Sequence, residues 1–231
     1  MGLSLPAGSV NKGVFVVQAK FDAIIWDLDG VLVDTEPDLQ ASFRASARAV
    51  GFGDLSEEQV SNKIGGGAKK ALASIFGDTH SHLVEPALAY FKDYYPGHCA
   101  VHSVLYPDVK ETLAALHGSV KFAVVTAKIR PATLQILKTL NIAHYFDYIV
   151  TADDMTRMKP DPQSIEMVQE RFDVAPDRVA MIGDMATDIQ AAHRAGSTGI
   201  GVSYGYGTKE DIVAAGADWV IDSPREILTL F

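Results

Sequence analysis

The stretch FDAIIWDLDGVLVDT, residues 21–35, decides the fold. It begins with a short apolar run, AIIW, and passes directly into two aspartates, Asp27 and Asp29, followed by Gly30. An apolar run of this length, bounded by acidic residues and glycine, predicts a buried β-strand over residues 23–26. Polar residues therefore begin where the strand ends, at its carboxyl end.

Five further apolar runs of similar length follow along the chain. Segments with helical spacing lie between them, for example PATLQILKTL (131–140) and SIEMVQERF (164–172). This alternation predicts an α/β fold, in which a parallel sheet is covered by helices on both faces. The five runs are FAVVT (122–126), YIVT (148–151), VAMI (179–182), GIGV (199–202) and WVI (219–221).

The alternation is interrupted between about residues 36 and 101, where no strand pattern occurs. This interval contains the helical patterns LQASFRASARAV, AKKALASIF and VEPALAYFKDYY. We predict a core domain of residues 1–35 and 102–231 and a small helical cap domain of residues 36–101. Ligands of open α/β sheets bind beyond the carboxyl ends of the strands, so a cap inserted after the first strand would cover the site. The aromatic cluster that includes Tyr95 is interpreted as packing within this cap.

Polar side chains also follow the other predicted strands. Thr126 ends the second of the six runs, Lys159 follows the third after a short loop, and Asp184 comes directly after the fourth, with Asp188 four residues on. A parallel sheet brings these positions together at one edge. A single aspartate at a strand end is often a helix cap or a turn residue. The whole set of acids in one crevice is repulsive unless a counter-ion is bound.

The acids predict a magnesium site. Asp27, Asp29 and Asp184 are the predicted metal ligands, because carboxylate oxygens suit Mg²⁺, which also bridges to a substrate phosphate. Asp188 is predicted to stand behind the ligands, where it orients Lys159 or a metal-bound water.

The same residues suit phosphoryl transfer. Alternate side chains of a strand point the same way, so Asp27 and Asp29 can both face a substrate if the first strand continues as far as Asp29. Asp27 is the predicted nucleophile, and Asp29 is predicted to protonate the leaving oxygen and later to deprotonate the attacking water. Thr126 offers its hydroxyl to the phosphoryl oxygens, and Lys159 offsets their negative charge. Gly30 allows the chain to turn away sharply beside the phosphate.

Composition narrows the class of protein. The chain has 231 residues, a formal net charge of -9 and one cysteine, Cys99. A disulfide framework is excluded, which suits a reducing compartment, and we expect a cytoplasmic protein. The acidic balance without basic runs argues against nucleic acid and membrane surfaces as partners. We expect residues 1–20 to form a loosely attached extension, because their apolar patch is too short for a membrane span. The expected partner is a small phosphorylated metabolite, and the expected state is a monomer or homodimer.

The motifs taken in order resemble the haloacid dehalogenase superfamily. DLDGVLVDT (27–35), the VVT that ends at Thr126, KPDP (159–162) and GDMATDIQAA (183–192) match its four motifs in order and spacing. The resemblance covers nearly the whole chain from about residue 21. It implies a Rossmann-like core, a helical cap inserted after the first motif, and Mg²⁺-dependent hydrolysis through an aspartyl-phosphate.

Within that superfamily the chain is most similar to phosphoglycolate phosphatases. Softer signals carry this similarity, among them IGGGAKKALASIFG in the cap and VSYGYGTKEDIVAAGADWVIDSPREI near the end. They imply a phosphoric monoester hydrolase whose substrate is 2-phosphoglycolate. Two positions depart from the pattern: Ala127 stands where relatives usually have asparagine, and Met185 where a small hydroxyl residue is usual. Ala127 and the following residue, Lys128, are predicted to line the substrate site.

A glycine-rich loop gives the cap a possible binding role. Gly65, Gly66 and Gly67 precede a helical run, so free backbone N–H groups at a helix N-terminus can bind an anion. Lys69 and Lys70 lie nearby in the sequence. With the family context, we predict that this loop meets the far end of the substrate, such as a carboxylate. A plain loop with solvated lysines is the alternative interpretation.

Two other functions stay open from the sequence. A sugar-phosphate mutase of the same fold, similar to β-phosphoglucomutase, shares the core motifs and differs only in its cap. A non-catalytic metabolite-binding module is the alternative from another class, although such a protein would be free to lose catalytic residues that this chain retains. Tyr204 and Tyr206 are interpreted either as the edge of the site or as packing beside a late strand.

Overall fold

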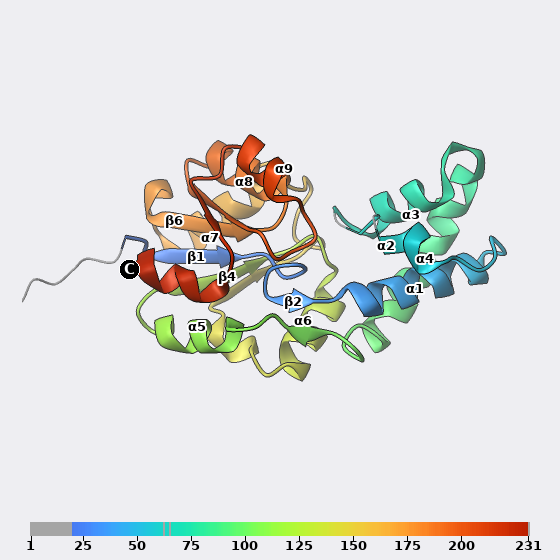
Figure 1. The fold of residues 1–231 in the computed structure, drawn as a ribbon, viewed down its shortest axis with the longest axis horizontal. Helices are drawn as coiled ribbons and strands as arrows, with labels where there is room; N and C mark the ends of the chain where they lie inside the picture. Colours follow the sequence, from blue (N-terminus) through green and yellow to red (C-terminus); the bar gives the residue numbers. More distant parts are fainter. Residues whose placement is uncertain (1–19, 62, 65, 231) are drawn as a thin grey trace, which may run out of the picture.

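A parallel β-sheet of six strands forms the centre of the protein (Figure 1). The computed structural model describes residues 20–61, 63–64 and 66–230, so the predicted N-terminal extension lies outside the described residues except for Lys20. All six strands predicted from the sequence are present, which confirms the α/β fold. They are β1 (Ala23–Trp26), β4 (Lys121–Val125), β5 (Tyr148–Val150), β6 (Val179–Gly183), β7 (Thr198–Val202) and β8 (Trp219–Ile221). The sheet order is β5-β4-β1-β6-β7-β8, which puts β1 in the middle.

Helices cover both faces of the sheet, so its central strands are apolar throughout. Ile24 and Trp26 of β1 pack in one hydrophobic cluster, and Ala23 and Ile25 pack in another on the opposite face. The first cluster also contains residues of α5 (Val109–Leu116), α6 (Arg130–Thr139) and η5 (Pro224–Leu230). The second contains residues of α7 (Gln163–Phe172) and α8 (Ala186–Arg194). The remaining elements of this part are α9 (Lys209–Ala214), η3 (Ala143–Tyr145) and η4 (Pro176–Arg178).

Residues 36–101, here called the helical insertion, lie beside the carboxyl end of β1 (Figure 1). No strand occurs in the described part of this interval, as the sequence predicted. Its centre is apolar, and Phe43 and Phe91 stack there with ring centroids 4.8 Å apart. Its elements are α1 (Glu36–Ala49), α2 (Glu57–Ser61), α3 (Ala68–Phe76), η1 (Asp78–Leu83), α4 (Val84–Tyr94) and η2 (Tyr95–Gly97).

The chain enters and leaves the helical insertion through a small antiparallel ribbon. Its two strands are β2 (Val33–Asp34) and β3 (Val104–Leu105). This ribbon was not predicted from the sequence, because strands of two residues are too short to show an alternating pattern. The pairing holds the incoming and outgoing segments side by side.

Asp38, in the first turn of α1, joins the same two segments a second time. Its side chain is buried and accepts hydrogen bonds from the backbone N–H groups of Val101, His102 and Ser103, at 2.9–3.0 Å. The Ser103 hydroxyl adds another at 2.7 Å. A buried carboxylate with this many donors is well satisfied, and it fixes the outgoing segment to the start of the first inserted helix.

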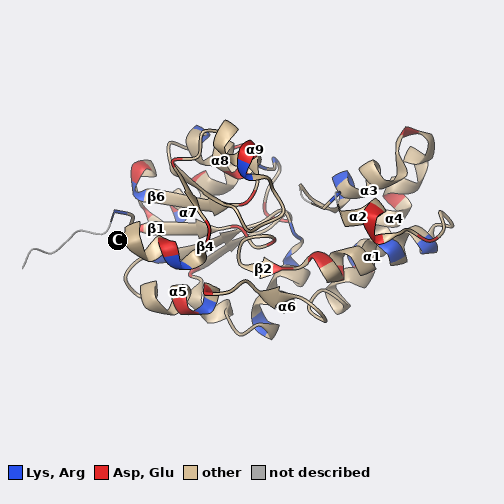
Figure 2. Ribbon diagram, viewed as in Figure 1, with Lys and Arg blue, Asp and Glu red and all other residues tan. Residues whose placement is uncertain are grey.

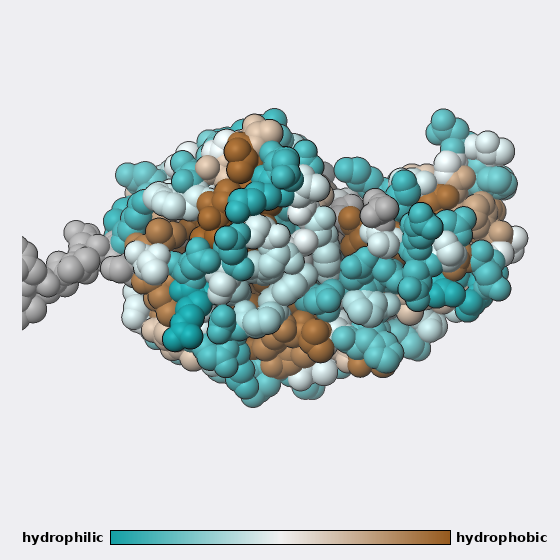
Figure 3. Space-filling model, in the orientation of Figure 1, coloured by the Kyte–Doolittle hydropathy of each residue, from teal (hydrophilic) through white to brown (hydrophobic). Residues whose placement is uncertain are grey.

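Charged residues are spread over both parts of the molecule, and acidic residues also occur on the loops between the sheet and the helical insertion (Figure 2). The space-filling view shows a larger and a smaller lobe, with hydrophobic areas separated by hydrophilic ones on this face (Figure 3). Within the described residues, none of the helices has the length and apolar character needed to cross a membrane.

Candidate active site

Asp27 lies at the carboxyl end of the central strand, next to a lysine. Its backbone N–H donates to the Ile182 carbonyl (2.9 Å), which continues the pairing of β1 with β6 by one residue. Lys159 Nζ donates to Asp27 Oδ1 at 3.0 Å and to the Val125 carbonyl at 3.3 Å. The same ammonium lies 2.5 Å from Asp188 Oδ1. Residues predicted as nucleophile, cation and orienting acid are therefore in direct contact.

Three carboxylates gather around this point. Asp27, Asp184 and Asp188 each offer an oxygen, and these oxygens lie within 4.8 Å of one another. Burial, with the charges of Asp188 and Asp29 adding to it, raises the pKa of Asp27 to about 7 despite the opposing effect of Lys159. Burial and then the charges of Asp188 and Asp27 raise the pKa of Asp184 as well.

The cluster contains three acids and one lysine, so among the described residues Lys159 alone does not balance the negative charge of the carboxylates. Burial alone would lower the pKa of Lys159, but the charges of Asp188 and Asp27 outweigh burial and raise it. Lys159 therefore stays positively charged. Its single charge still leaves an excess of negative charge on the three carboxylates. A hard divalent cation with oxygen ligands would remove that excess, and the donor set fits Mg²⁺.

Glycines leave the space in which Asp184 sits. Gly30 has a φ of +79°, and a Cβ built on it would lie 2.1 Å from Asp184 Oδ2. A Cβ on Gly205 would lie 2.3 Å from Asp184 Cβ, and one on Gly207 would lie 1.9 Å from the Asp184 carbonyl oxygen. All three distances are shorter than any real contact of a Cβ, so the side chain and the carbonyl group of Asp184 are held in a cradle of positions that admit only glycine.

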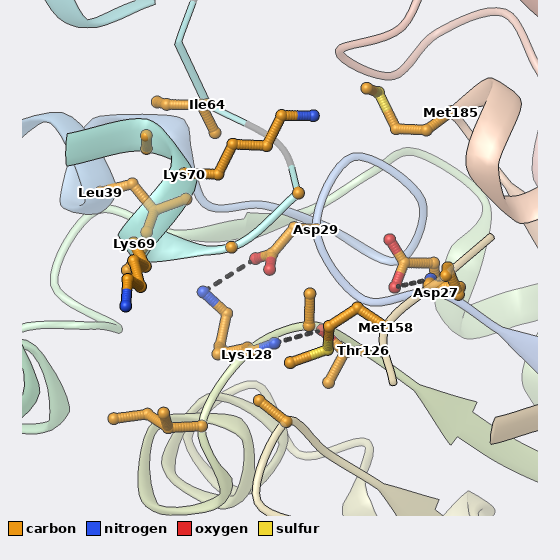
Figure 4. Close-up of a pocket in the computed structure, with 18 of the residues that line it drawn as sticks. Asp27, Asp29, Leu39, Ile64, Lys69, Lys70, Thr126, Lys128, Met158 and Met185 are labelled. Carbon is orange, nitrogen blue, oxygen red and sulfur yellow. Dashed lines mark hydrogen bonds and ion pairs between the residues drawn. The ribbon is translucent and has the colours of Figure 1, made fainter. Parts of the chain in front are cut away.

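Asp29 is held apart from the three-carboxylate cluster. Its Oδ1 lies 3.0 Å from Lys128 Nζ and accepts a hydrogen bond from the Thr35 hydroxyl. Figure 4 shows the ion pair with Lys128 as a dashed line across the pocket. The group of possible metal ligands found among the described residues includes Asp188 and not Asp29. The assignment of Asp29 to the metal stays a prediction.

Thr126, Ala127 and Lys128 form the loop after β4 and line the same cavity. The Lys128 backbone N–H donates to Thr126 Oγ1 at 3.2 Å. The Lys128 side chain is only 4% exposed, and its Nζ donates to the hydroxyl of Tyr95 at 2.5 Å. Lys128 therefore contacts a residue of the helical insertion as well as Asp29.

Tyr206 connects two parts of the site. Its backbone N–H donates to Asp184 Oδ2 at 2.7 Å, and its hydroxyl accepts from the Thr35 backbone N–H at 2.7 Å. Of the two interpretations that the sequence left open, the position at the edge of the site is the one observed, since Tyr206 lines the cavity. Tyr204 packs instead against Tyr106, with ring centroids 5.0 Å apart.

The cavity above these residues has a volume of about 600 Å³. Its walls in the helical insertion are largely apolar, and Gly66, Gly67, Lys69 and Lys70 also line it. The contact of the glycine loop with a substrate stays a prediction. Lys69 forms an ion pair with Glu85 (2.5 Å), and Figure 4 shows the Lys69 and Lys70 side chains pointing in different directions. Gly65 lies outside the described residues. The apolar walls from the insertion include Leu39, Phe43, Ile64, Ala71, Leu88 and Phe91.

Comparison with known proteins agrees with this geometry. The family model of haloacid dehalogenase-like hydrolases matches residues 24–202, which include all the acids and lysines of the core side of the site. The chain belongs to this family.

Several relatives of this haloacid dehalogenase-like hydrolase are named as phosphatases. N-acetylmuramic acid 6-phosphate phosphatase of Pseudomonas aeruginosa is 36% identical, with 90% of this chain and 94% of the relative covered. Phosphoglycolate phosphatase of Vibrio vulnificus is also 36% identical, with 92% and 97% covered. A crystal structure described as a predicted phosphoglycolate phosphatase from Haemophilus somnus superposes with a TM-score of 0.83 at 31% identity, covering 91% and 98%. These relatives confirm the prediction of a phosphoric monoester hydrolase.

Thr35 and Tyr95 also belong to the site of this haloacid dehalogenase-like hydrolase and were not predicted from the sequence. Thr35, which ends the first motif, contacts Asp29, and its place in DLDGVLVDT was the available signal. Tyr95 was interpreted as packing in the cap, and its ring does stack on Phe91 at 4.8 Å. Its contact with Lys128 joins positions 33 residues apart in the chain and has no local signal.

Proposed function

We propose that this chain is a Mg²⁺-dependent phosphatase that hydrolyses a small phosphomonoester, 2-phosphoglycolate, through an aspartyl-phosphate on Asp27. The observation that carries the proposal is the contact of Lys159 with both Asp27 and Asp188, beside Asp184 and at the base of a cavity. We assign the metal to Asp27 and Asp184, with Asp188 and Asp29 as further candidate ligands. When bound, Mg²⁺ would neutralise negative charge on the carboxylates and on the phosphoryl oxygens.

The reaction then follows from the residues. A carboxylate oxygen of Asp27 attacks phosphorus, and the bond from phosphorus to the leaving oxygen breaks. Asp29 gives its proton to that oxygen, so the alcohol leaves neutral. Asp29 next takes a proton from water as the water attacks the aspartyl-phosphate, which releases phosphate and regenerates Asp27. Lys159 offsets the negative charge on the transferring group, and the Thr126 hydroxyl binds its oxygens.

The division into a core of residues 1–35 and 102–231 and a cap of 36–101 belongs to the same proposal. The cap would carry the recognition of the leaving group, through Gly66, Gly67 and the lysines that follow them. The position of these residues on the wall of the cavity supports this role.

A second substrate is favoured by the size of the cavity. A volume of about 600 Å³ falls within the range of sites for drug-sized ligands and is large for a two-carbon acid. The apolar walls suit a substrate with a larger hydrophobic face, such as the phosphorylated sugar acid named for the Pseudomonas aeruginosa relative. N-acetylmuramic acid 6-phosphate is therefore the second candidate, and it shares a carboxylate with 2-phosphoglycolate.

Phosphate release from a panel of phosphorylated metabolites, with magnesium and with chelator, tests the proposal. The panel contains both candidate substrates and β-glucose 1-phosphate, and analysis of the sugar products separates a phosphatase from a mutase. Asp27→Asn keeps the shape of the side chain and should reduce kcat by roughly 10⁴-fold or more. Phosphate release that persists in this variant, or that is independent of magnesium, would contradict the mechanism.

A further inference from the structure

Lys128 is a buried cation whose backbone N–H and carbonyl both form hydrogen bonds. Its backbone N–H donates to Thr126 Oγ1, and its carbonyl accepts from the Ala152 backbone N–H at 3.0 Å. Its side chain is 4% exposed, which for a lysine requires compensating partners. These two contacts fix the backbone of Lys128 in the loop after β4, and the neighbours of its ammonium fix the side chain.

Two groups meet the Lys128 ammonium. Asp29 Oδ1 lies 3.0 Å away, and the Tyr95 hydroxyl lies 2.5 Å away. Lys159, the other buried lysine of the site, contacts Asp27 and Asp188 instead. Among the ion pairs of the described residues, Asp27 pairs with Lys159 and Asp29 pairs with Lys128.

Tyr95 brings the helical insertion into this arrangement. It begins η2, directly after α4, and is 1% exposed. Its ring stacks on Phe91 of α4, so its hydroxyl is held by the packing of the insertion. Asp29 is also held from the incoming side, where Thr35 precedes α1. Thr35 therefore contacts the Asp29 carboxylate directly from one end of the insertion, and Tyr95 acts on it from near the other end through Lys128.

We propose that Lys128 is a positioning residue, which Tyr95 anchors and which holds the Asp29 carboxyl group in the orientation to give its proton to the leaving oxygen and to take one back from the attacking water. The proposal rests on the proposed function, in which Asp29 is the acid. A proton donor must lie within hydrogen-bond reach of its acceptor, and a charged partner that is itself immobile fixes the donor. This role differs from direct binding of the substrate, which is the prediction made for Lys128 from the sequence.

Three substrates separate the two roles. 2-Phosphoglycolate and ethyl phosphate both release a poor leaving group that needs a proton, and only the first carries a carboxylate. p-Nitrophenyl phosphate releases a phenolate that leaves without one. We expect Lys128→Met to lower kcat/KM for both alkyl phosphates by about 10- to 100-fold and to change it little for the aryl phosphate. Tyr95→Phe keeps the ring and should give a smaller loss with the same selectivity.

Matched controls keep the test interpretable. Lys121→Met removes an exposed lysine that pairs with Asp147, and Tyr94→Phe removes the hydroxyl next to Tyr95 in the chain. Both should leave all three values of kcat/KM unchanged, and thermal unfolding should show that every variant is folded. Chemistry at Asp27 is checked in parallel with Asp27→Asn, which should abolish all three activities.

Each other outcome overturns the inference. A loss confined to 2-phosphoglycolate would make Lys128 a ligand of the substrate carboxylate. An equal loss for all three substrates would assign it to the phosphoryl group or to folding, and no loss would remove it from the reaction. If the unmodified protein released phosphate from none of the three, the proposed function itself would fail, which is a different result from an active enzyme with an unselective Lys128→Met variant.

Discussion

The two walls of the cavity differ in how their side chains are held. On the core wall, Asp27, Asp184 and Lys159 each have polar partners at hydrogen-bond or ion-pair distance, and glycines shape the space beside Asp184. On the wall from the helical insertion, the side chains are mainly apolar, and the ion pair of Lys69 is with Glu85 of the same insertion. The core wall has one arrangement suited to one kind of chemistry. The insertion wall offers size and shape, which can differ between relatives that share the chemistry.

The largest effect is expected from filling the glycine cradle of the core wall. Gly30→Ala would put a Cβ 2.1 Å from Asp184 Oδ2, so the acid must move, and such a displacement should lower kcat by about 100-fold or more. Gly118→Ala is the matched control, because Gly118 has a φ of +83° and no atom within 4 Å of the added Cβ. Both variants share a backbone strain of about 1–2 kcal/mol, and only the first should lose activity. Equal loss in steady-state assays would mean that strain, not the cradle, matters.

An effect of intermediate size is expected on thermal stability, and it comes from the acids of the core wall. Burial raises the pKa of Asp27 from 3.8 to about 7, so the folded protein keeps this proton more tightly than the unfolded chain does. That contribution to stability is present below 3.8 and is lost as the pH rises through about 7. A divalent cation replaces the proton, so Mg²⁺ should raise Tm by several degrees at pH ~8 and much less at pH ~5. Thermal unfolding with Mg²⁺ and with chelator, at matched ionic strength, measures this difference. An equal gain at both pH values would show that the cluster does not bind the ion.

The smallest effect is expected on the insertion wall. Gly66 has a φ of +75°, and a Cβ there would lie 3.1 Å from Lys70 Cδ. Gly66→Ala should raise KM for 2-phosphoglycolate roughly several-fold and leave an aryl phosphate almost unaffected. Gly51→Ala is its control, with a φ of +76° and open space around the added Cβ. Equal effects of Gly66→Ala on both substrates would show that the glycine loop does not recognise the leaving group. The insertion wall would then have no demonstrated role in substrate choice.

The sequence predicted the core wall better than the insertion wall for a physical reason. Each residue of the core wall follows a buried strand, so a parallel sheet that brings strand ends together also brings Asp27, Thr126 and Asp184 together. The six strands and the helical nature of residues 36–101 could be predicted in the same way, from local periodicity. The ribbon of β2 and β3 could not, because two residues carry no period.

Contacts that depend on side-chain direction also could not be predicted from the sequence. A first strand extended beyond Trp26, where β1 ends, would point Asp27 and Asp29 the same way, and this predicted that both face the substrate. It did not predict that Asp29 pairs with Lys128 while Asp27 pairs with Lys159. Nor does helical spacing in the insertion distinguish Tyr95, which reaches Lys128, from the tyrosine before it. Such pairings are decided by tertiary packing.

Asp38 has a consequence for protein engineering. Relatives with a common core and different substrates invite the exchange of whole insertions, and the obvious splice points are residues 35 and 102. Such a cut would separate Asp38 from two of its backbone donors, His102 and Ser103, which would then come from the other parent. A graft should therefore carry its own aspartate at position 38, keep proline out of positions 101–103 and retain a hydroxyl at 103. Chimeras made by these rules would keep the hydrogen bonds of Asp38 to residues 101–103 and would take their substrate specificity from the new insertion.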